Sequence, residues 1–437
     1  MPILNNFLRL EELYQIYLKH PLVTTDSRKI EKGSIFFALK GDNFDGNAFA
    51  LSSLEKGASY AVTDDPACAI DDRILLVDNV LQTLQDLARM HRQKLAIPVL
   101  AITGSNGKTT TKELVASVLS KKFRTTYTLG NLNNHIGVPL TLLRFSSDTQ
   151  FGIVEMGANH PGEIDNLCRI ALPDYGLITN IGRAHLEGFG SFEGVIRAKT
   201  ELYRFLEQSN GTIFINQANP LLTKNAGEVT RVNYTTQKGL EGLEGEIISA
   251  DPFLSFRTLF PKGWLFIRTR LVGGYNLENA LAASAVGLYF GVDPTTIAAA
   301  IASYQPDNNR SQLIETSRNK LLMDAYNANP SSTQAALENF ARLAVSPKGV
   351  ILGDMLELGS TSKEEHQKIV DLLSSMTPDL VFLVGPVYSG CNLTDSFRCF
   401  IDSDELAAYL ENEPLKGYNL LIKGSRGMKL ETVVPKL

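Results

Sequence analysis

The sequence has few cysteines, no basic excess and no long apolar run. Its 437 residues include four cysteines, Cys68, Cys168, Cys391 and Cys399, and no C-x-x-C pair. So few thiols at such spacing exclude a disulfide framework and are typical of reduced cysteines. Residues 1–20 have apolar side chains at helical spacing interrupted by charges, and no uninterrupted apolar stretch reaches membrane-spanning length. We therefore expect a cytoplasmic protein without a signal peptide or membrane span.

The charge balance gives no sign of a polymer partner. The formal net charge is −5, and no long run of Lys and Arg occurs. Nucleic acids and anionic membranes attract basic patches, so we expect neither as a partner. The content is 44% hydrophobic and 20% charged residues, which is ordinary globular material, long enough for two to four domains.

Changes of pattern divide the chain into three parts. Residues 1–90 hold short β-rich runs and end in a helical pattern over 80–95, which predicts a small mixed α/β domain. Residues 91–307 alternate apolar strand candidates with helices, as a doubly wound core around a parallel sheet does. Residues 308–437 repeat that alternation. The sequence thus predicts a three-domain α/β protein.

A glycine-rich loop, "TGSNGKTT", lies between an apolar strand and a helix whose apolar residues share one face. Its glycines allow close backbone approach, the helix start favours an anion, Lys108 adds positive charge and Thr109 offers a hydroxyl to magnesium. The usual pattern has one more glycine, where this chain has Ile102. A glycine turn with a solvated lysine is the alternative, but the placement between strand and helix favours a triphosphate site. The predicted nucleotide loop comprises Gly104, Ser105, Asn106, Gly107, Lys108, Thr109 and Thr110.

Several polar residues follow other predicted strands. Glu155 ends the apolar run "FGIV", His185 and Glu187 lie in a glycine-rich loop after the next strand, and Lys199 follows within a helical pattern. Each alone would more often be solvated. Because open α/β sheets bind ligands at the carboxyl ends of their strands, together with Thr109 they predict a metal and phosphate cluster.

Two further signals leave alternatives open. Asn276 and Asn279 begin a predicted helix, where they either meet a base or cap the helix. Asp324 ends a strand, where a carboxylate either binds a ribose or shapes a turn.

The motifs together resemble one family. "TGSNGKTTTKE", "GNLNNHIGVPLTLL", "EMGANHPGEI", "NIGRAHLEGFGS", "DAYNANPSS" and "LGDMLELG" occur in the order found in the Mur ligases, and "TDSRKIEKGSIFFALKGDNFDG" extends the resemblance to the start of the chain. That family carries the shortened loop G-x-x-G-K-[ST]-T, so the glycine missing at Ile102 no longer counts against a nucleotide site. Within the family the motifs are most similar to the ligases that join D-alanyl-D-alanine to UDP-N-acetylmuramoyl-tripeptide in peptidoglycan synthesis.

The resemblance implies a fold and a chemistry. It implies an amino-terminal domain for the UDP end of the substrate, a central P-loop ATPase-like domain, and a Rossmann-like carboxyl-terminal domain that closes over ATP. It implies that the γ-phosphoryl of ATP activates the substrate carboxylate as an acyl phosphate, which the amine of D-alanyl-D-alanine then attacks. Charge neutralisation and positioning supply most of such catalysis.

The resemblance also implies roles for individual residues. Lys108 would bind the β- and γ-phosphates, Lys199 would be carbamylated, and two magnesium ions would be held by Thr109, Glu155, His185 and the modified Lys199. Asn279 would face the adenine, with Arg310 and Asp324 on the ribose and phosphate side. Ser27 and Arg28 would bind UDP, and Asn134 would lie beside the reacting centre. The family often has "DGH" where this chain has "DGN", which leaves the role of Asn47 undetermined.

Two rival functions remain. A sister ligase that adds a single amino acid uses the same core, but the type that adds diaminopimelate carries "DNPR", which is absent here, and "DAYNANP" favours the D-alanyl-D-alanine ligases. A nucleotide-driven switch would hydrolyse ATP without ligation. We expect a monomer; the sequence does not determine the oligomeric state, nor whether the third peptide residue is lysine or diaminopimelate.

Overall fold

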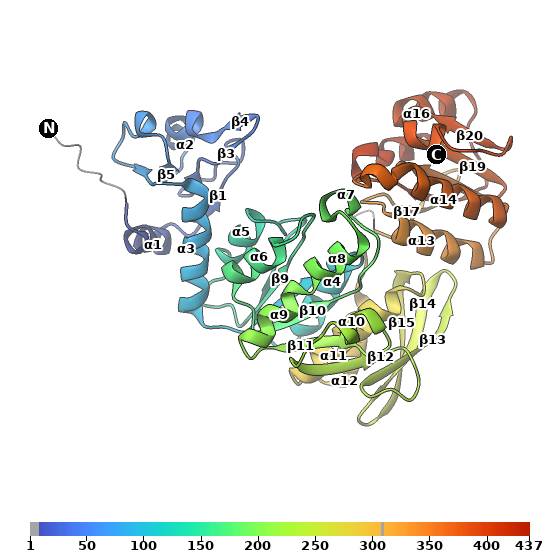
Figure 1. Ribbon diagram of the computed structural model, residues 1–437, viewed down its shortest axis with the longest axis horizontal. Coiled ribbons are helices and arrows are strands. Elements are labelled where there is room, and N and C mark those ends of the chain that lie inside the picture. The colour runs from blue at the N-terminus through green and yellow to red at the C-terminus, as the bar shows by residue number, and fades with distance from the viewer. Residues whose placement is uncertain (1–7, 307–309) are drawn as a thin grey trace.

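Three bodies, each built on its own sheet, make up the protein (Figure 1). The computed structural model describes residues 8–306 and 310–437. The predicted boundary between residues 307 and 308 lies outside the described residues. The other predicted boundary, between 90 and 91, falls inside the long helix α3, Val80–Leu95, which confirms the helical pattern over 80–95.

The first body is a small parallel sheet in the order β1-β2-β5-β6. The side chains of Ile35, Phe36 and Phe37 in its second strand are fully buried, which explains why so short a strand is apolar throughout. Its elements are α1 Leu10–Lys19, β1 Val23–Thr24, β2 Ile35–Phe37, the hairpin β3 Lys40–Gly41 and β4 Phe44–Asp45, α2 Ala50–Glu55, β5 Tyr60–Thr63, β6 Ile74–Leu76 and α3, with 3₁₀ turns at Gly46–Phe49 and Pro66–Cys68.

The central body is a nine-stranded sheet in the order β15-β14-β13-β12-β11-β10-β7-β9-β8. Strands β7 to β13 pair in parallel, together with β8 at one edge, as predicted for a doubly wound core. The ribbon β13-β14-β15 is antiparallel, which the sequence analysis did not anticipate. The strands are β7 Val99–Thr103, β8 Thr125–Tyr127, β9 Phe151–Glu155, β10 Tyr175–Ile178, β11 Thr212–Asn216, β12 Thr230–Thr235, β13 Leu243–Ala250, β14 Phe253–Phe260 and β15 Gly263–Val272.

Helices cover both faces of the central sheet (Figure 1). The residues predicted to face the core on the helix after the loop, Leu114, Val115, Val118 and Leu119, are all buried. The helices are α4 Lys108–Leu119, α5 Gly137–Leu142, α6 Glu163–Ala171, α7 Leu186–Phe189, α8 Phe192–Lys199, α9 Glu201–Gln208, α10 Pro220–Lys224, α11 Asn276–Tyr289 and α12 Pro294–Ser303.

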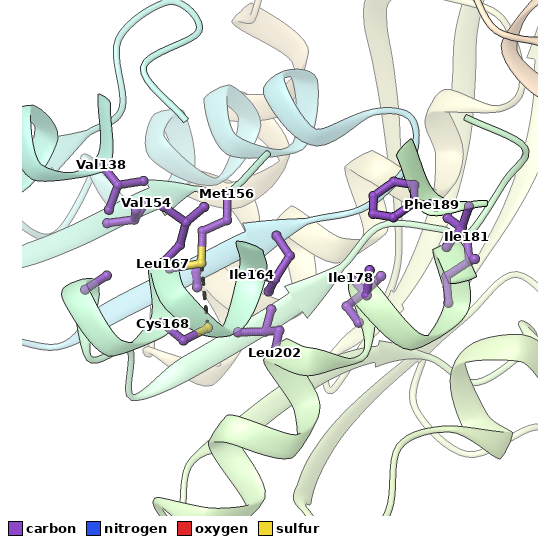
Figure 2. Packing of buried hydrophobic residues seen from close by; sticks show 14 of the residues in the cluster. Val138, Val154, Met156, Ile164, Leu167, Cys168, Ile178, Ile181, Phe189 and Leu202 are labelled. Atoms are coloured by element: carbon purple, nitrogen blue, oxygen red, sulfur yellow. Dashed lines mark hydrogen bonds between the residues drawn. The ribbon is translucent and has the colours of Figure 1, made fainter. Parts of the chain in front are cut away.

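On one face of the central sheet, α6 packs against strand β9. Figure 2 shows Ile164, Leu167 and Cys168 of α6 against Val154 and Met156, and the Cys168 thiol donates a weak hydrogen bond to the Met156 sulfur at 3.8 Å. Burial raises the pKa of the Cys168 thiol well above its ordinary value. All four cysteines are free in the structure.

The third body is a six-stranded sheet in the order β16-β17-β21-β18-β19-β20, parallel except for β16 at one edge. The sequence predicts "DLVFLVGP" and "YNLLIKGS" as successive strands with a helical segment between them. These runs form β19 and β21, but the chain between them holds strand β20 as well as helices α15 and α16. The elements are β16 Gln312–Glu315, β17 Lys320–Asp324, α13 Pro330–Arg342, β18 Lys348–Gly353, α14 Ser362–Met376, β19 Leu380–Val384, α15 Pro386–Ser389, β20 Phe397–Phe400, α16 Ser403–Asn412 and β21 Asn419–Lys423, with 3₁₀ turns at Gly359–Thr361, Arg426–Met428 and Leu430–Lys436. In the part of the chain that the structure describes, no helix is both long and apolar enough to cross a membrane.

Candidate active site

The glycine-rich loop connects β7 to α4 in a conformation that requires glycine. Gly104 has φ +143° and Gly107 has φ +77°. A Cβ atom on Gly104 would lie 2.0 Å from Thr179 Oγ1, and one on Gly107 would lie 2.6 Å from Asn279 Oδ1. Both the positive φ and the lack of space exclude a side chain, so the backbone N–H groups stay accessible at the start of α4.

Lys108 holds its ammonium within this loop. Its Nζ donates hydrogen bonds to the carbonyl oxygens of Gly104 at 2.8 Å and Ser105 at 3.2 Å. Burial lowers the pKa of Lys108 to about 8, with a further contribution from Arg310, and the carboxylate of Glu155 opposes the change. A positive charge is therefore held at the place where a helix start already favours an anion.

Glu155 ends β9 beside the loop and is 1% exposed. Its Oε1 accepts a hydrogen bond from Asn133 Nδ2 at 2.8 Å, whereas its Oε2 is buried without a hydrogen-bond partner and lies 3.7 Å from Lys112 Nζ. A buried carboxylate oxygen left without a hydrogen bond is costly unless a cation binds it. Oε2 thus has an ion-pair partner in Lys112 but no hydrogen bond, which leaves it able to bind a hard metal ion.

The donor set suits magnesium better than a metal that needs a protein cage. Among the described residues, no group of three or more His, Cys, Asp or Glu side chains could hold a metal ion by itself. Magnesium commonly takes one or two carboxylates and completes its shell with waters and substrate phosphates. Glu155 and the buried Thr109, both lining the same cavity, fit that pattern.

His185 immediately precedes α7, has φ +52° and lines the cavity. Its Nδ1 forms a hydrogen bond with Glu357 Oε2, which comes from the third body. This hydrogen bond lowers the pKa of Glu357. Glu187, predicted beside His185, contacts the same turn through its backbone, since its N–H donates to the carbonyl oxygen of Glu357 at 3.3 Å.

Lys199 ends α8 and is 1% exposed. Its Nζ donates to the carbonyl oxygen of Ala158 at 3.3 Å and lies 5.3 Å from the centre of the Phe189 ring. Burial lowers the pKa of Lys199 to about 7, the nearby Lys108 adds to the effect, and two carboxylates oppose it. The lowered pKa makes the free amine of Lys199 available at a lower pH than that of a solvated lysine.

The third body contributes a basic and aromatic group. The guanidinium of Arg310 stacks 3.6 Å from the centre of the Tyr326 ring, and its buried Nε has no hydrogen-bond partner. Asp324 accepts hydrogen bonds from Lys423 Nζ at 2.7 Å and from the Ser311 N–H at 3.1 Å. Asp324 therefore connects the end of β17 to Ser311 and to Lys423 of β21 while also lining the cavity.

Asn276 and Asn279 connect α11 to its surroundings. Asn276 Nδ2 donates to the carbonyl oxygen of Val272 at 2.8 Å. Asn279 donates to Asn276 Oδ1 at 2.9 Å and accepts from Thr111 Oγ1 at 3.0 Å. No side chain caps α11, so the capping alternative is wrong for both residues. Asn279 instead packs under the glycine of the nucleotide loop.

A cavity of about 950 Å³ between the central and third bodies joins most of these groups, but neither Gly104 nor Lys199 belongs to its lining. Predicted residues line both of its sides, with the nucleotide loop on one and the third body on the other. They are Ser105, Asn106, Gly107, Lys108, Thr109, Thr110, Asn134, Glu155, His185, Asn279, Arg310 and Asp324.

Three family models match the chain in succession. They describe the Mur ligase family catalytic domain over residues 21–92, the Mur ligase middle domain over 102–287, and the Mur ligase glutamate ligase domain over 309–426. The chain belongs to the Mur ligase family.

Individual Mur ligases are similar over nearly the whole length. UDP-N-acetylmuramoyl-tripeptide--D-alanyl-D-alanine ligase of Bacillus subtilis is 36% identical over 95% of this chain and 92% of its own, and the enzyme of that name from Escherichia coli is 34% identical over 95% and 93%. A crystal structure of MurF from Acinetobacter baumannii superposes with a TM-score of 0.85 at 33% identity, covering 95% of this chain and 92% of that one. MurF from Thermotoga maritima in complex with ADP gives 0.84 at 28% identity, covering 96% and 97%.

Three residues of this Mur ligase that the motifs single out lie away from the cavity. Ser27 and Arg28 lie in the first body, where the Ser27 carbonyl oxygen accepts from Lys56 Nζ at 2.9 Å and the exposed Arg28 pairs with Asp26 at 2.8 Å. Asn47 is buried and connects its loop to the end of β5 by hydrogen bonds with Thr63 and Asp64.

Other cavity residues were missed. Asn133, next to the predicted Asn134, is the one that binds Glu155, while Asn134 Oδ1 accepts from the backbone N–H groups of Ile136 and Gly137 at the start of α5. The motif "GNLNN" carried that signal without distinguishing its two final asparagines. Missed residues that line the cavity include Asn133, His160, Glu163, Asn180, Tyr326, Glu357 and Lys423.

Proposed function

We propose that this Mur ligase joins D-alanyl-D-alanine to UDP-N-acetylmuramoyl-tripeptide and converts ATP to ADP and phosphate. The supporting observation is one cavity that combines a phosphate-binding loop with an orphaned buried carboxylate oxygen and with groups from a second body. The named relatives at 34–36% identity have that activity in their names. The protein would act in the cytoplasm, where nucleotide-linked precursors are made.

The reaction is a carboxylate activation followed by amide formation. The terminal carboxylate of the tripeptide attacks the γ-phosphorus of ATP, and ADP leaves. The amine of D-alanyl-D-alanine then attacks the carbonyl carbon of the acyl phosphate, the nitrogen loses a proton, and inorganic phosphate leaves. Lys108 would hold the β- and γ-phosphates, and closure of the cavity by the third body would exclude water that hydrolyses the acyl phosphate.

Thr109, Glu155 and His185 would hold two magnesium ions, which when bound neutralise phosphate charge. Lys199 would contribute after reaction of its free amine with carbon dioxide, which forms an N–C bond, releases a proton and leaves an anion with two oxygens. The low pKa of Lys199 supports this proposal because only the free amine reacts.

The remaining roles divide the chain into three units. Residues 1–90 would bind UDP through Ser27 and Arg28, residues 91–307 would bind ATP, and residues 308–437 would close over the nucleotide. Arg310 and Asp324 would contact the ribose and phosphates. Asn279 would lie near the adenine and Asn134 beside the reacting carboxylate.

A ligation assay tests the whole proposal. Purified protein with ATP, magnesium, D-alanyl-D-alanine and a UDP-linked tripeptide should yield the pentapeptide, identified by mass, and tripeptides ending in lysine or diaminopimelate should give different rates. Phosphate should appear at an appreciable rate only when peptide and amine are both present. A nucleotide switch would release phosphate without either, and a single-amino-acid ligase would use the shorter peptide instead.

A further inference from the structure

Glu357 of the third body meets His185 of the central body at the edge of the cavity. Its carboxylate forms the hydrogen bond with His185 Nδ1, and its carbonyl oxygen accepts from the Glu187 N–H at 3.3 Å. His185 has φ +52° and Glu357 has φ +64°, both in the left-handed region that non-glycine residues rarely adopt. Two segments far apart in the sequence thus meet through residues in uncommon backbone conformations, which cluster at functional sites.

The turn that carries Glu357 is firmly held. The N–H groups of the two residues before it donate to His366 Nε2 at 2.9 Å and to Ser425 Oγ at 2.8 Å. Asp354, at the start of the turn, accepts from two N–H groups of α15 at 2.9 and 3.0 Å. The buried His366 in turn donates from Nδ1 to the carbonyl oxygen of Ser362 at 2.7 Å. The position of Glu357 is therefore set by the fold of the third body.

The hydrogen bond fixes which nitrogen of His185 carries a proton. An ionised carboxylate only accepts hydrogen bonds, so Nδ1 must be the donor, and in the neutral ring Nε2 keeps its lone pair. A histidine that binds a metal through one nitrogen commonly donates its other N–H to a carboxylate, which sets the ring orientation and raises the basicity of the ligand.

We propose that Glu357 is a positioning residue that sets the tautomer and orientation of His185, so the metal site of the central body is complete only when the third body is docked. The proposal rests on the proposed function for the role of His185. Docking of the third body would then strengthen metal binding by His185. Because such coupling is reciprocal, metal binding would favour docking by the same factor.

The alternative is that the hydrogen bond between His185 and Glu357 only attaches the third body to the central body. A second polar contact between the same two bodies provides a control for this alternative. Arg183 Nη1 pairs with Glu365 Oε1 at 2.9 Å, again across the central and third bodies. This ion pair does not involve His185. Arg183→Gln therefore weakens the docking of the third body without removing the His185 partner.

The experiment compares Glu357→Ala with Arg183→Gln in the full chain. Long-range ¹H–¹⁵N spectra, with the His185 signals assigned from a His185→Gln variant, report the tautomer. Calorimetry with Mn²⁺ and a non-hydrolysable ATP analogue reports metal affinity. We expect Nδ1–H in the wild type, a shift towards Nε2–H in Glu357→Ala, and about a 10- to 100-fold loss of Mn²⁺ affinity in that variant. Arg183→Gln should keep the wild-type tautomer and lose less than threefold in affinity.

If Glu357→Ala does not fold, Glu357→Gln replaces it, because glutamine keeps the shape of the side chain and an acceptor oxygen. We expect a smaller loss of Mn²⁺ affinity in Glu357→Gln than in Glu357→Ala. An unchanged tautomer in Glu357→Ala, or affinity losses in the Glu357 variants no larger than in Arg183→Gln, would overturn the proposal. Failure of the wild type to ligate would instead refute the proposed function, since the tautomer measurement needs no turnover.

Discussion

Replacing Lys199 tests two separate effects. One is the free energy that burial of its ammonium costs the folded state, and the other is the proposed role of its amine in ligation. Burial and neighbouring charge lower its pKa from 10.5 to about 7, and the side chain is 1% exposed. At about 1.4 kcal/mol for each pKa unit, a charged Lys199 costs the folded state on the order of 5 kcal/mol. The structure offers its ammonium one hydrogen bond, to Ala158, although three N–H groups must be satisfied.

This cost depends on pH in a defined direction. The folded-state pKa lies below the unfolded value, so between pH 7 and 10.5 the unfolded chain binds more protons and stability rises with pH. Below pH 7 both states are protonated and the full penalty applies. We expect Lys199→Met, which has similar volume and no charge, to raise the free energy of unfolding by up to about 5 kcal/mol at pH 6 and about 2 kcal/mol at pH 9.

Urea denaturation of both proteins in buffers freed of carbon dioxide measures the difference. The same Lys199→Met variant should lose ligation, as should Lys199→Ala. Lys199→Arg should be no better, because arginine keeps its charge and forms no carbamate. ¹³C-labelled bicarbonate should give a carbamate carbon signal in the wild type that Lys199→Arg lacks, and small carboxylates should partly restore Lys199→Ala. An active Lys199→Arg enzyme, or a stability gain in Lys199→Met that does not change with pH, would refute the reasoning.

Three other substitutions test the cavity. Lys108→Ala should abolish ligation with a melting temperature near the wild-type value, because one partly exposed side chain and no core volume is lost; near-normal turnover would contradict its assignment. Asp324→Ala should weaken ATP binding more than UDP-peptide binding, as measured by calorimetry. Because this change leaves the buried Lys423 without its carboxylate partner, Asp324→Asn is the better-folded comparison. Equal losses of affinity for both ligands would count against the domain roles. Gly107→Ala should cost about 1–3 kcal/mol of stability, since φ is +77° and the new methyl would meet Asn279, and should abolish nucleotide binding; wild-type denaturation midpoints would show that the loop can rearrange.

Regular apolar patterns made much of the fold predictable. Strand β9 is buried along its length, and β10 and β11 are buried after their first residue, so their sequences are mostly apolar. The apolar spacing in α4 alone predicted its buried face. Strand β14 alternates buried and partly exposed residues because one face of the antiparallel ribbon meets solvent. Its pairing with β13 and β15 depends on contacts between strands, which a local pattern does not contain. The half-exposed β20 was missed for the same reason.

The candidate site was predictable where a single sheet positions it. Thr109 follows β7 and Glu155 ends the adjacent strand β9, and parallel topology brings such positions together. Glu357, Tyr326 and Lys423 reach the cavity from a separate body, so their approach depends on how two bodies dock. The pKa of Lys199 was likewise inaccessible, because burial and the distance to Lys108 are properties of the fold.

Helix α3 has a practical consequence for dividing this protein. It continues without a break from residue 80 to residue 95, starts with an Asn79 cap, and near its other end Arg92 pairs with Asp174 of the central body at 2.8 Å. Figure 1 shows it standing between the first and central bodies. Cutting the chain at 90/91 would split this helix and separate Arg92 from the residues before it. A separately expressed first body should therefore keep the whole of α3 and end after Ala96, whose left-handed conformation already terminates the helix.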